Sequence, residues 1–206
     1  MKHDEWIAHI KTLGGERKYV EPAKGTVNPR VFIDRLAKKM PANVTVVADV
    51  GQNQIWTCTE YKFRKEGRLL TSGGMGTMGY SVPAAIGAKM ADNSRATVAI
   101  CGDGAFQMSF MELATAVQFG VDIKVVVMTN NRLGMVRELQ TNGYHDRQTA
   151  VFLDGSPDFI KLAEAYGIPA MRVYDDDTME KGVEMLAEHK GICLVEVVVD
   201  KDMPTL

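Results

Sequence analysis

The sequence is poor in several features that would each point to a particular class of protein. It has only three cysteines in 206 residues, they are widely separated, and two lie in or beside apolar runs. We therefore expect reduced core thiols and no disulfide framework. The four histidines show no metal-ligand spacing, which argues against a zinc site. The cysteines are Cys58, Cys101 and Cys193.

Long hydrophobic runs and runs of positive charge are also missing. The longest apolar stretches have only the length of a strand, which excludes a membrane span, and the polar start MKHDEW does not resemble a signal peptide. The formal net charge is −2 and no basic run exceeds two residues, so we expect no surface for nucleic acid or for an anionic membrane. These absences favour a cytoplasmic protein that acts on small molecules.

What the chain does contain is a regular alternation of apolar runs with amphipathic helical patterns. Several runs lack polar alternation, as strands that are buried on both faces do. The alternation predicts an α/β domain with a doubly wound, mostly parallel sheet and helices on both faces. The predicted strands are residues 44–50, 69–71, 96–101, 123–129, 171–174 and 193–199.

Two of the predicted helices begin with the same local signal, a capping residue followed by proline. Asn28 precedes Pro29, and Ser156 precedes Pro157. A further single helix is expected over residues 110–119. Residues 1–27 have a different character, because a short amphipathic pattern is followed by a connector. We therefore divide the chain into an N-terminal helix and connector, residues 1–27, and one domain, residues 28–206.

Polar or glycine-rich loops follow four of the predicted strands. Ligands bind at the carboxyl ends of parallel strands, where the N-termini of helices converge, so these loops outline a single site. The loops read GQNQ, SGGMGTMG, GDG and NNRLGM.

The GDG loop sets Asp103 between Gly102 and Gly104, where backbone amides suit an anion but the carboxylate would repel it. A divalent cation between Asp103 and a diphosphate removes this conflict, since magnesium is bound through one or two carboxylates and phosphate oxygens. Asn130 follows the next strand and can supply an amide oxygen, and the carbonyl of Arg132 a third ligand. Taken singly, a tight turn at GDG and a strand exit at NN are the alternative interpretation.

A competing pattern is the dinucleotide fingerprint G-x-G-x-x-G, which is matched by Gly74, Gly76 and Gly79. The true fingerprint is followed about 20 residues later by an exposed acidic residue at the end of a second strand. Here the strand before the glycines is short, and Asp103 lies between glycines. The pattern therefore argues against a nicotinamide cofactor.

Taken together, these motifs resemble a known family. The span from GDG to NN is similar to the thiamin diphosphate motif. The segments DVGQNQIW, TSGGMGTMGYSVPAAIGAK, FMELATAVQFG, NNRLGMV, PDFIKLAEAYGI and LVEVVVDKD resemble the C-terminal domain of the large catalytic subunit of acetolactate synthase. The resemblance runs from residue 28 to residue 202, and it implies a thiamin diphosphate-binding fold with thiamin diphosphate and Mg²⁺ as cofactors.

The resemblance also implies roles for individual residues. Asp103, Asn130 and the Arg132 carbonyl would bind Mg²⁺. Gly76 and Met78 are the predicted catalytic residues, since Gly76 would meet the aminopyrimidine ring and Met78 would force the cofactor into its bent shape. The bent cofactor would act on pyruvate and join the two-carbon unit to a second 2-keto acid. The predicted cofactor-binding residues are Gln52, Asn53, Gly76, Met78, Gly102, Asp103, Gly104, Ala105, Asn130, Arg132, Gly134 and Met135.

Some parts of this family's active site are not recognisable in the sequence. The glutamate that protonates the pyrimidine belongs to an amino-terminal domain of a partner subunit, and a middle domain carries FAD. The resemblance thus implies a homodimer and the rest of the catalytic subunit as partners, with a regulatory small subunit as a further candidate, and an isolated chain that is inactive.

Three departures from the family concern the site. Asn53 stands where the family usually has histidine, and Leu139 where it has tryptophan, so the second 2-keto acid stays open. The family also has a longer tail than the one that ends here at Leu206. Two alternatives remain: another thiamin diphosphate decarboxylase, carboligase or oxidase, or a non-catalytic assembly module of the same fold.

Overall fold

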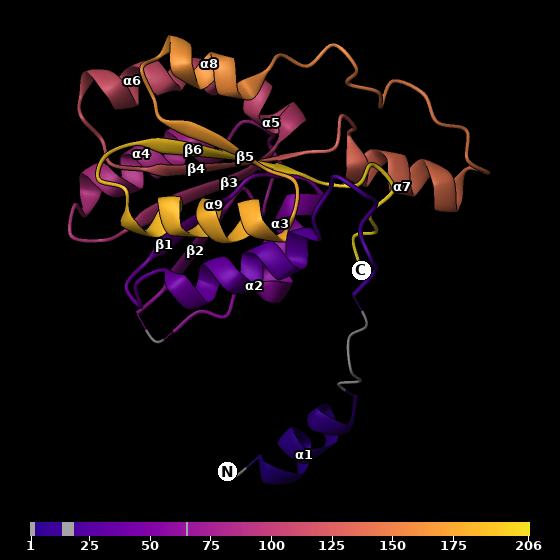
Figure 1. The fold of residues 1–206 in the computed structure, drawn as a ribbon. Coiled ribbons are helices and arrows are strands. Elements are labelled where there is room, and N and C mark those ends of the chain that lie inside the picture. The colour runs from indigo at the N-terminus through magenta and orange to yellow at the C-terminus, as the bar shows by residue number, and fades with distance from the viewer. Residues whose placement is uncertain (1–2, 14–18, 65) are drawn as a thin grey trace.

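A six-stranded, wholly parallel sheet forms the middle layer of the protein (Figure 1). The computed structural model describes residues 3–13, 19–64 and 66–206. The strand order is β2-β1-β3-β4-β6-β5, so the order reverses between β1 and β3. The strands are β1 (Thr45–Ala48), β2 (Arg68–Thr71), β3 (Thr97–Gly102), β4 (Lys124–Thr129), β5 (Ala170–Val173) and β6 (Cys193–Val198).

Helices cover both faces of this sheet, as the sequence predicts. One face carries α2 (Pro29–Lys39), α3 (Gln52–Glu60) and α9 (Asp176–Glu188). The other face carries α4 (Ser81–Ala91), α5 (Asp103–Gln107), α6 (Leu113–Gln118) and α8 (Phe159–Ala165). Helix α7 (Gly134–Gly143) lies beyond the carboxyl ends of the strands (Figure 1). The predicted doubly wound α/β fold is confirmed.

The continuous apolar runs are explained by alternate residues that face opposite helical layers. Val46 and Val98 pack with α2, α3 and α9. Their chain neighbours Val47 and Ala99 pack with α4, α5 and α8. All four side chains are fully buried. Because both faces of the sheet are covered, neither face of these strands retains a polar stripe.

The helix starts confirm one predicted cap and correct the other. Asn28 accepts hydrogen bonds from two backbone N–H groups in the first turn of α2. The second prediction was wrong, because α8 begins at Phe159 and its cap is Asp158, whose carboxylate accepts from two N–H groups. The hydroxyl of Ser156 instead donates to the Leu153 carbonyl at 2.8 Å. An aspartate that lies closer to the apolar run thus displaces serine as the cap.

Two further expectations need correction. The single helix expected over residues 110–119 is divided into a 3₁₀ turn, η1 (Phe110–Glu112), and the short helix α6. Cys101 and Cys193 are buried as predicted, but Cys58 is exposed on the outer side of α3. Cys58 is therefore not a core residue.

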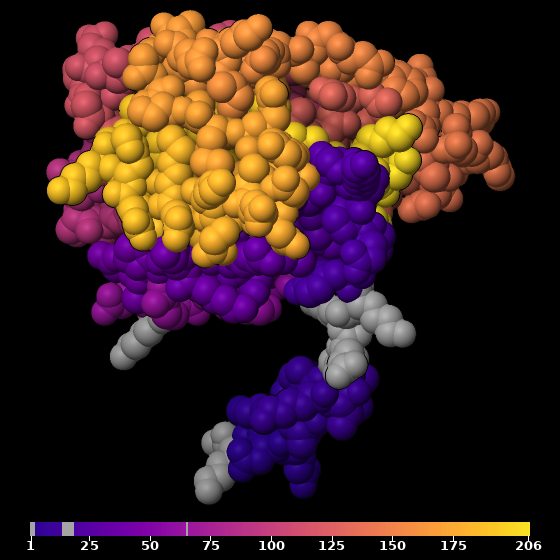
Figure 2. Space-filling view, in the orientation of Figure 1, coloured from indigo at the N-terminus to yellow at the C-terminus, as the bar shows by residue number. Residues whose placement is uncertain are grey.

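The predicted N-terminal helix is present as α1 (Asp4–Leu13), which has no buried residue and stands apart from the layered domain (Figures 1 and 2). Part of the predicted connector, residues 14–18, lies outside the described residues, and the boundary at residue 27 stays a prediction. Within residues 3–13, 19–64 and 66–206, no helix combines the length and the apolar character that crossing a bilayer requires.

Two helical glycines offer a test of how closely α9 packs on the sheet. A Cβ atom at Gly182 would lie 2.6 Å from Val173 Cγ2 and 3.2 Å from Val195 Cγ1, whereas one at Gly87 in α4 meets nothing within 4 Å. We expect Gly182→Ala to lower the free energy of unfolding by about 1–3 kcal/mol through overpacking. Gly87→Ala is the matched control and should raise it by up to about 1 kcal/mol. Urea unfolding of both variants measures the difference, and equal effects would contradict this account.

Candidate active site

A pocket opens at the carboxyl ends of β1, β3 and β4, where the strand order reverses. Such a reversal separates the helices that follow neighbouring strands and leaves a crevice for a ligand. Of the predicted cofactor-binding residues, only Gly76 does not line this pocket; it is exposed, with a φ of 65°. The residues that do line it are Gln52, Asn53, Met78, Gly102, Asp103, Gly104, Ala105, Asn130, Arg132, Gly134 and Met135.

Asp103 lies at the floor of the pocket with 2% of its surface exposed. Its carboxylate accepts backbone N–H groups from Gly104 at 2.8 Å, Asn131 at 2.6 Å and Asn130 at 3.2 Å. Among the described residues, no cationic side chain forms an ion pair with it. Burial raises the pKa of Asp103 to about 6, although the hydrogen bonds from Asn131, Gly104 and Asn130 oppose this shift. A nearby cation would stabilise the charged form.

The three predicted metal ligands lie next to one another. The backbone N–H of Asn130 donates to Asp103 Oδ2, and the backbone N–H of Arg132 donates to Asn130 Oδ1 at 3.1 Å. Carboxylate, amide and carbonyl oxygens are the hard ligands that Mg²⁺ prefers, and Mg²⁺ usually takes further oxygens from phosphate and water. The unpaired buried carboxylate of Asp103 fits such an ion. No cluster of three or more His, Cys, Asp or Glu side chains that could hold a metal occurs in the part of the chain that the structure describes.

Three helices begin at the pocket without a side-chain cap. The residues before α3, α5 and α7 are Gly51, Gly102 and Leu133, and none of them forms a capping hydrogen bond. Of the helices away from the pocket, α2, α8 and α9 are capped by Asn28, Asp158 and Asp175, whereas α6 has no side-chain cap and the first N–H group of α4 is bound by Asp49. Although the Gly104 N–H of α5 is bonded to Asp103, uncapped first turns leave other backbone N–H groups and the positive end of the helix dipole available to an anion. This end of the pocket therefore suits a diphosphate.

Two glycines let side chains approach the pocket floor closely. A Cβ atom at Gly134 would lie 1.9 Å from Gln52 Oε1, so the start of α7 must be glycine for the Gln52 amide to keep its place. A Cβ atom at Gly104 would lie 2.8 Å from Leu133 Cδ2 and 3.3 Å from Met78 Cε. Glycine at these positions is explained by close approach, because neither has a positive φ.

The other wall of the pocket is apolar. Met78 and Met135 are half-buried and line it together with Leu133 and Val136. The pocket thus combines an end with oxygen ligands and free N–H groups and a wall of aliphatic and thioether groups. Such a combination matches a ligand with a diphosphate at one end and aromatic rings at the other.

The side chain of Asn53 makes hydrogen bonds that the sequence did not predict. Its side-chain nitrogen donates to the backbone carbonyls of Asp49 at 2.8 Å and Ile100 at 3.2 Å, which ties the ends of β1 and β3 together. Asn53 lines the pocket, but its amide N–H groups are occupied by the protein backbone. Its role in cofactor binding stays a prediction.

Asp49 is the residue that sequence reasoning missed. Its fully buried carboxylate accepts the backbone N–H groups of Val50 at 2.8 Å, Gly79 at 3.0 Å and Ser81 at 2.8 Å. Asp49 thereby holds the loop that carries Met78, and it forms a hydrogen bond with Ser81, the first residue of α4. Asp49 stands at the end of an apolar run in the sequence, but its partners Gly79 and Ser81 lie 30 and 32 positions away, so no local pattern marks its role.

Comparison with known proteins defines the class to which this site belongs. Residues 49–197 match the family model of the C-terminal TPP binding domain of thiamine pyrophosphate enzymes. The match includes every residue of the pocket, so the chain belongs to this family of thiamin diphosphate-binding domains. The expected class of cofactor is confirmed, and the dinucleotide alternative is not supported.

The relatives are acetolactate synthase subunits. The chain is 38% identical over 199 residues to the acetolactate synthase large subunit of Lactococcus lactis. This alignment covers 96% of this chain and 34% of that protein. It is 36% identical over 211 residues to the mitochondrial acetolactate synthase catalytic subunit of Saccharomyces cerevisiae. That alignment covers 100% of this chain and 31% of the yeast protein. It is 33% identical over 199 residues to the large subunit of acetolactate synthase isozyme 2 of Escherichia coli. That alignment covers 96% of this chain and 36% of the Escherichia coli protein.

The predicted resemblance to acetolactate synthase is therefore confirmed. The chain spans about a third of the length of these relatives.

Asp49 provides a test of how the Met78 loop is held. We expect Asp49→Asn to lower the free energy of unfolding by about 1–3 kcal/mol, because a buried N–H group loses its acceptor. Asp177→Asn on the exposed side of α9 is the control and should have little effect. Urea unfolding measures both, and an unchanged Asp49→Asn variant would show that the carboxylate does not hold the loop.

Proposed function

We propose that this chain forms the part of an acetolactate synthase that binds thiamin diphosphate and Mg²⁺. In this proposal the complete enzyme decarboxylates pyruvate and joins the two-carbon unit to a second 2-keto acid. The observation that carries the proposal is the meeting of Asp103, Asn130 and Arg132 in one pocket with Met78, on a domain of this family. The similarity to acetolactate synthase subunits over nearly the whole chain supports this choice among thiamin diphosphate enzymes.

The residues of the pocket have distinct tasks in this proposal. Asp103, Asn130 and the Arg132 carbonyl hold Mg²⁺, and the first turns of α3, α5 and α7 donate N–H groups to the diphosphate. Met78 and Met135 line the apolar wall and would pack against the rings of the cofactor. The cofactor, when bound, supplies a ring carbon that acts as a nucleophile toward the keto group of pyruvate. The chain itself binds and orients the cofactor and keeps water away from the apolar wall.

The second 2-keto acid is proposed to meet the outer side of α7. Leu139 is 61% exposed there and lines a second hollow with Val136, Tyr144 and Arg147. Val136 lines this hollow and the main pocket alike, so the two lie next to each other along α7. Leucine at this position leaves a wider wall than an aromatic residue would.

Further parts of the active site are proposed to come from other domains. No glutamate is found among the described residues that line the pocket, so the group that protonates the pyrimidine must come from elsewhere. We propose a separate pyrimidine-binding domain for this role, an FAD-binding domain in the same catalytic subunit, and a homodimer that completes the site. A regulatory subunit and a cytoplasmic location stay predictions.

Thermal unfolding of the purified chain tests cofactor binding. With both ligands at about 100 times their dissociation constants, binding should stabilise the chain by about 2.7 kcal/mol, which raises the unfolding temperature by about 5–10 °C. The rise should require thiamin diphosphate and Mg²⁺ together and disappear in Asp103→Asn, while Asp177→Asn keeps it. No rise with the unaltered chain, or a rise with NAD alone, would contradict the proposal.

A second test concerns what the chain cannot do alone. We expect no acetolactate from pyruvate, thiamin diphosphate and Mg²⁺ with the pure chain, because no proton donor for the pyrimidine lines the pocket. Activity should appear when the chain replaces the matched part of the Lactococcus lactis acetolactate synthase large subunit, so that the rest of that protein is present. Acetolactate formation by the chain alone would contradict the proposed division of the site. A product other than acetolactate from the completed enzyme would favour another thiamin diphosphate enzyme.

A further inference from the structure

The C-terminal residues of the chain are hydrogen-bonded to two helices that border the pocket, α3 and α7. Gln52 Nε2 on α3 donates to the Met203 carbonyl at 2.9 Å, and Trp56 Nε1 donates to the Pro204 carbonyl at 3.1 Å. In Figure 2 the yellow C-terminal residues lie between the indigo segment that leads to α2 and the orange α7. We call residues 203–205 the tail.

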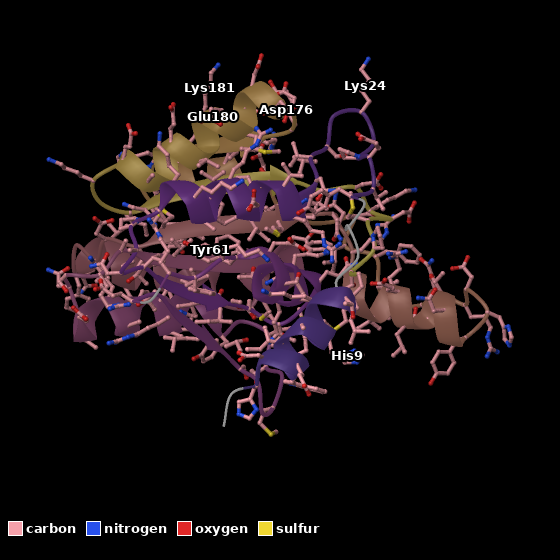
Figure 3. The ribbon with its side chains drawn as sticks, turned by 90° about the horizontal axis from the view of Figure 1, so that it is seen from below. His9, Lys24, Tyr61, Asp176, Glu180 and Lys181 are labelled. Carbon is pink, nitrogen blue, oxygen red and sulfur yellow. The ribbon has the colours of Figure 1, made fainter. Side chains whose placement is uncertain are left out.

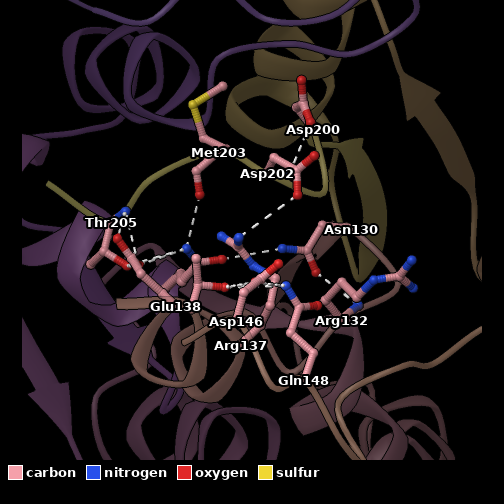
Figure 4. Close-up of polar contacts among 12 residues, drawn as sticks. Asn130, Arg132, Arg137, Glu138, Asp146, Gln148, Asp200, Asp202, Met203 and Thr205 are labelled. Atoms are coloured by element: carbon pink, nitrogen blue, oxygen red, sulfur yellow. Dashed lines mark hydrogen bonds and ion pairs between the residues drawn. The ribbon is translucent and has the colours of Figure 1, made fainter. Parts of the chain in front are cut away.

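The carboxylate of Glu138 is the point where this tail meets α7. It accepts the backbone N–H of Thr205 at 3.1 and 3.2 Å, and it also accepts the Thr205 hydroxyl. It further accepts Gln52 Nε2 at 3.2 Å. Figure 4 shows Glu138 beside Thr205, with Met203 and Asn130 close by. A half-buried carboxylate thus joins α7, the tail and α3 in one network.

This network fixes which way the Gln52 amide points. Its nitrogen faces three acceptors: Glu138 Oε2, the Met203 carbonyl and, at 3.1 Å, the Thr205 hydroxyl oxygen. A flipped amide would place Oε1 against the carboxylate and the carbonyl, with no hydrogen between them. The oxygen of Gln52 is therefore directed the other way, where it accepts Asn130 Nδ2 at 3.2 Å.

The same reasoning passes on to Asn130. Because Asn130 Nδ2 donates to Gln52, Asn130 Oδ1 faces the opposite side, where it accepts the backbone N–H of Arg132. A cation can be bound by the amide oxygen and never by the amide nitrogen, so this orientation is the one that a metal ligand needs. Glu138 contributes to this orientation together with the Met203 carbonyl, and it does so from outside the pocket, which it contacts through Gln52.

We propose that Glu138 is a positioning residue, which orients the Gln52 amide and through it directs the Asn130 oxygen toward the divalent cation. This inference rests on the proposed function, because it concerns the same site. Thr205 also belongs to this hydrogen-bond network, because its N–H and hydroxyl groups hold the Glu138 carboxylate in place. Residues that orient a metal ligand from outside typically contribute 10- to 100-fold to metal affinity, roughly.

The test is a magnesium titration of the unfolding temperature at saturating thiamin diphosphate. Glu138→Met keeps the length of the side chain and removes its acceptors, so the Mg²⁺ concentration that gives half of the temperature rise should increase at least about tenfold. Glu138→Gln retains one acceptor oxygen and should stay within about threefold of the unaltered chain. Glu180→Met is the matched control on the outer side of α9, where Figure 3 shows Glu180 directed away from the sheet.

A second readout needs no cofactor. In the NMR spectrum of the ligand-free chain, the side-chain amide protons of Asn130 should exchange slowly, and Glu138→Met should make them exchange fast. Thr205→Val removes the hydroxyl contact, leaves the carboxylate in the chain and should still raise the magnesium midpoint above that of the unaltered chain. This variant keeps the test decisive if Glu138→Met does not fold.

The outcomes separate the two proposals. An unaltered chain that does not respond to the two ligands would overturn the proposed function. An unaltered chain that responds, beside Glu138 and Thr205 variants with an unchanged magnesium midpoint, would overturn the positioning role alone. A lower unfolding temperature of the ligand-free variants with an unchanged midpoint would show that Glu138 acts only in folding.

Discussion

A carboxylate that is taken out of water with only backbone N–H groups around it is the constraint on which this domain depends. The register of the sheet sets Gly102 opposite Met128, so the residues that follow β3 and β4 meet at one point. Asp103 and Asn130 are brought together by that register. Burial makes the charge of Asp103 costly, and neighbouring N–H groups offset this cost only in part. A positive ion at this place would complete the electrostatics of the fold as well as those of the site.

The opposite edge of the sheet shows what a purely structural charge looks like. Lys89 and Lys124 are buried near the amino ends of the strands. The ammonium group of Lys89 donates to the carbonyls of Asn93 and Arg95, each at 2.8 Å. That of Lys124 donates to the carbonyls of His189 and Gly191 and pairs with Asp122. These cations close loops and are bonded by oxygen atoms of the chain itself. Asp103 at the carboxyl edge is bonded by N–H groups alone.

The strands, both helical layers and the cluster of Asp103, Asn130 and Arg132 could be predicted from the sequence, because periodicity and strand-end residues are local signals. Asp49 and Glu138 could not be assigned in that way. Their partners lie 30 and 67 positions away and are defined by loop geometry that no local pattern encodes. The α8 cap was misassigned because Ser156 and Asp158 both suit the role, and only the exact start of the helix decides between them. The fold therefore follows from pattern, while the supports of the site follow from packing.

The open first turns of α3, α5 and α7 have a consequence for local order. N–H groups without a partner in the chain must be bonded by solvent or by a ligand, so the order of these turns depends on what occupies the pocket. They lie directly after β1, β3 and β4, which are among the most deeply buried strands. In each of these strand-to-helix units a buried strand is therefore followed by a helix turn whose order depends on the contents of the pocket. Occupation of the pocket would extend the order of the sheet into the helices, so that the ligand would become part of the folded core.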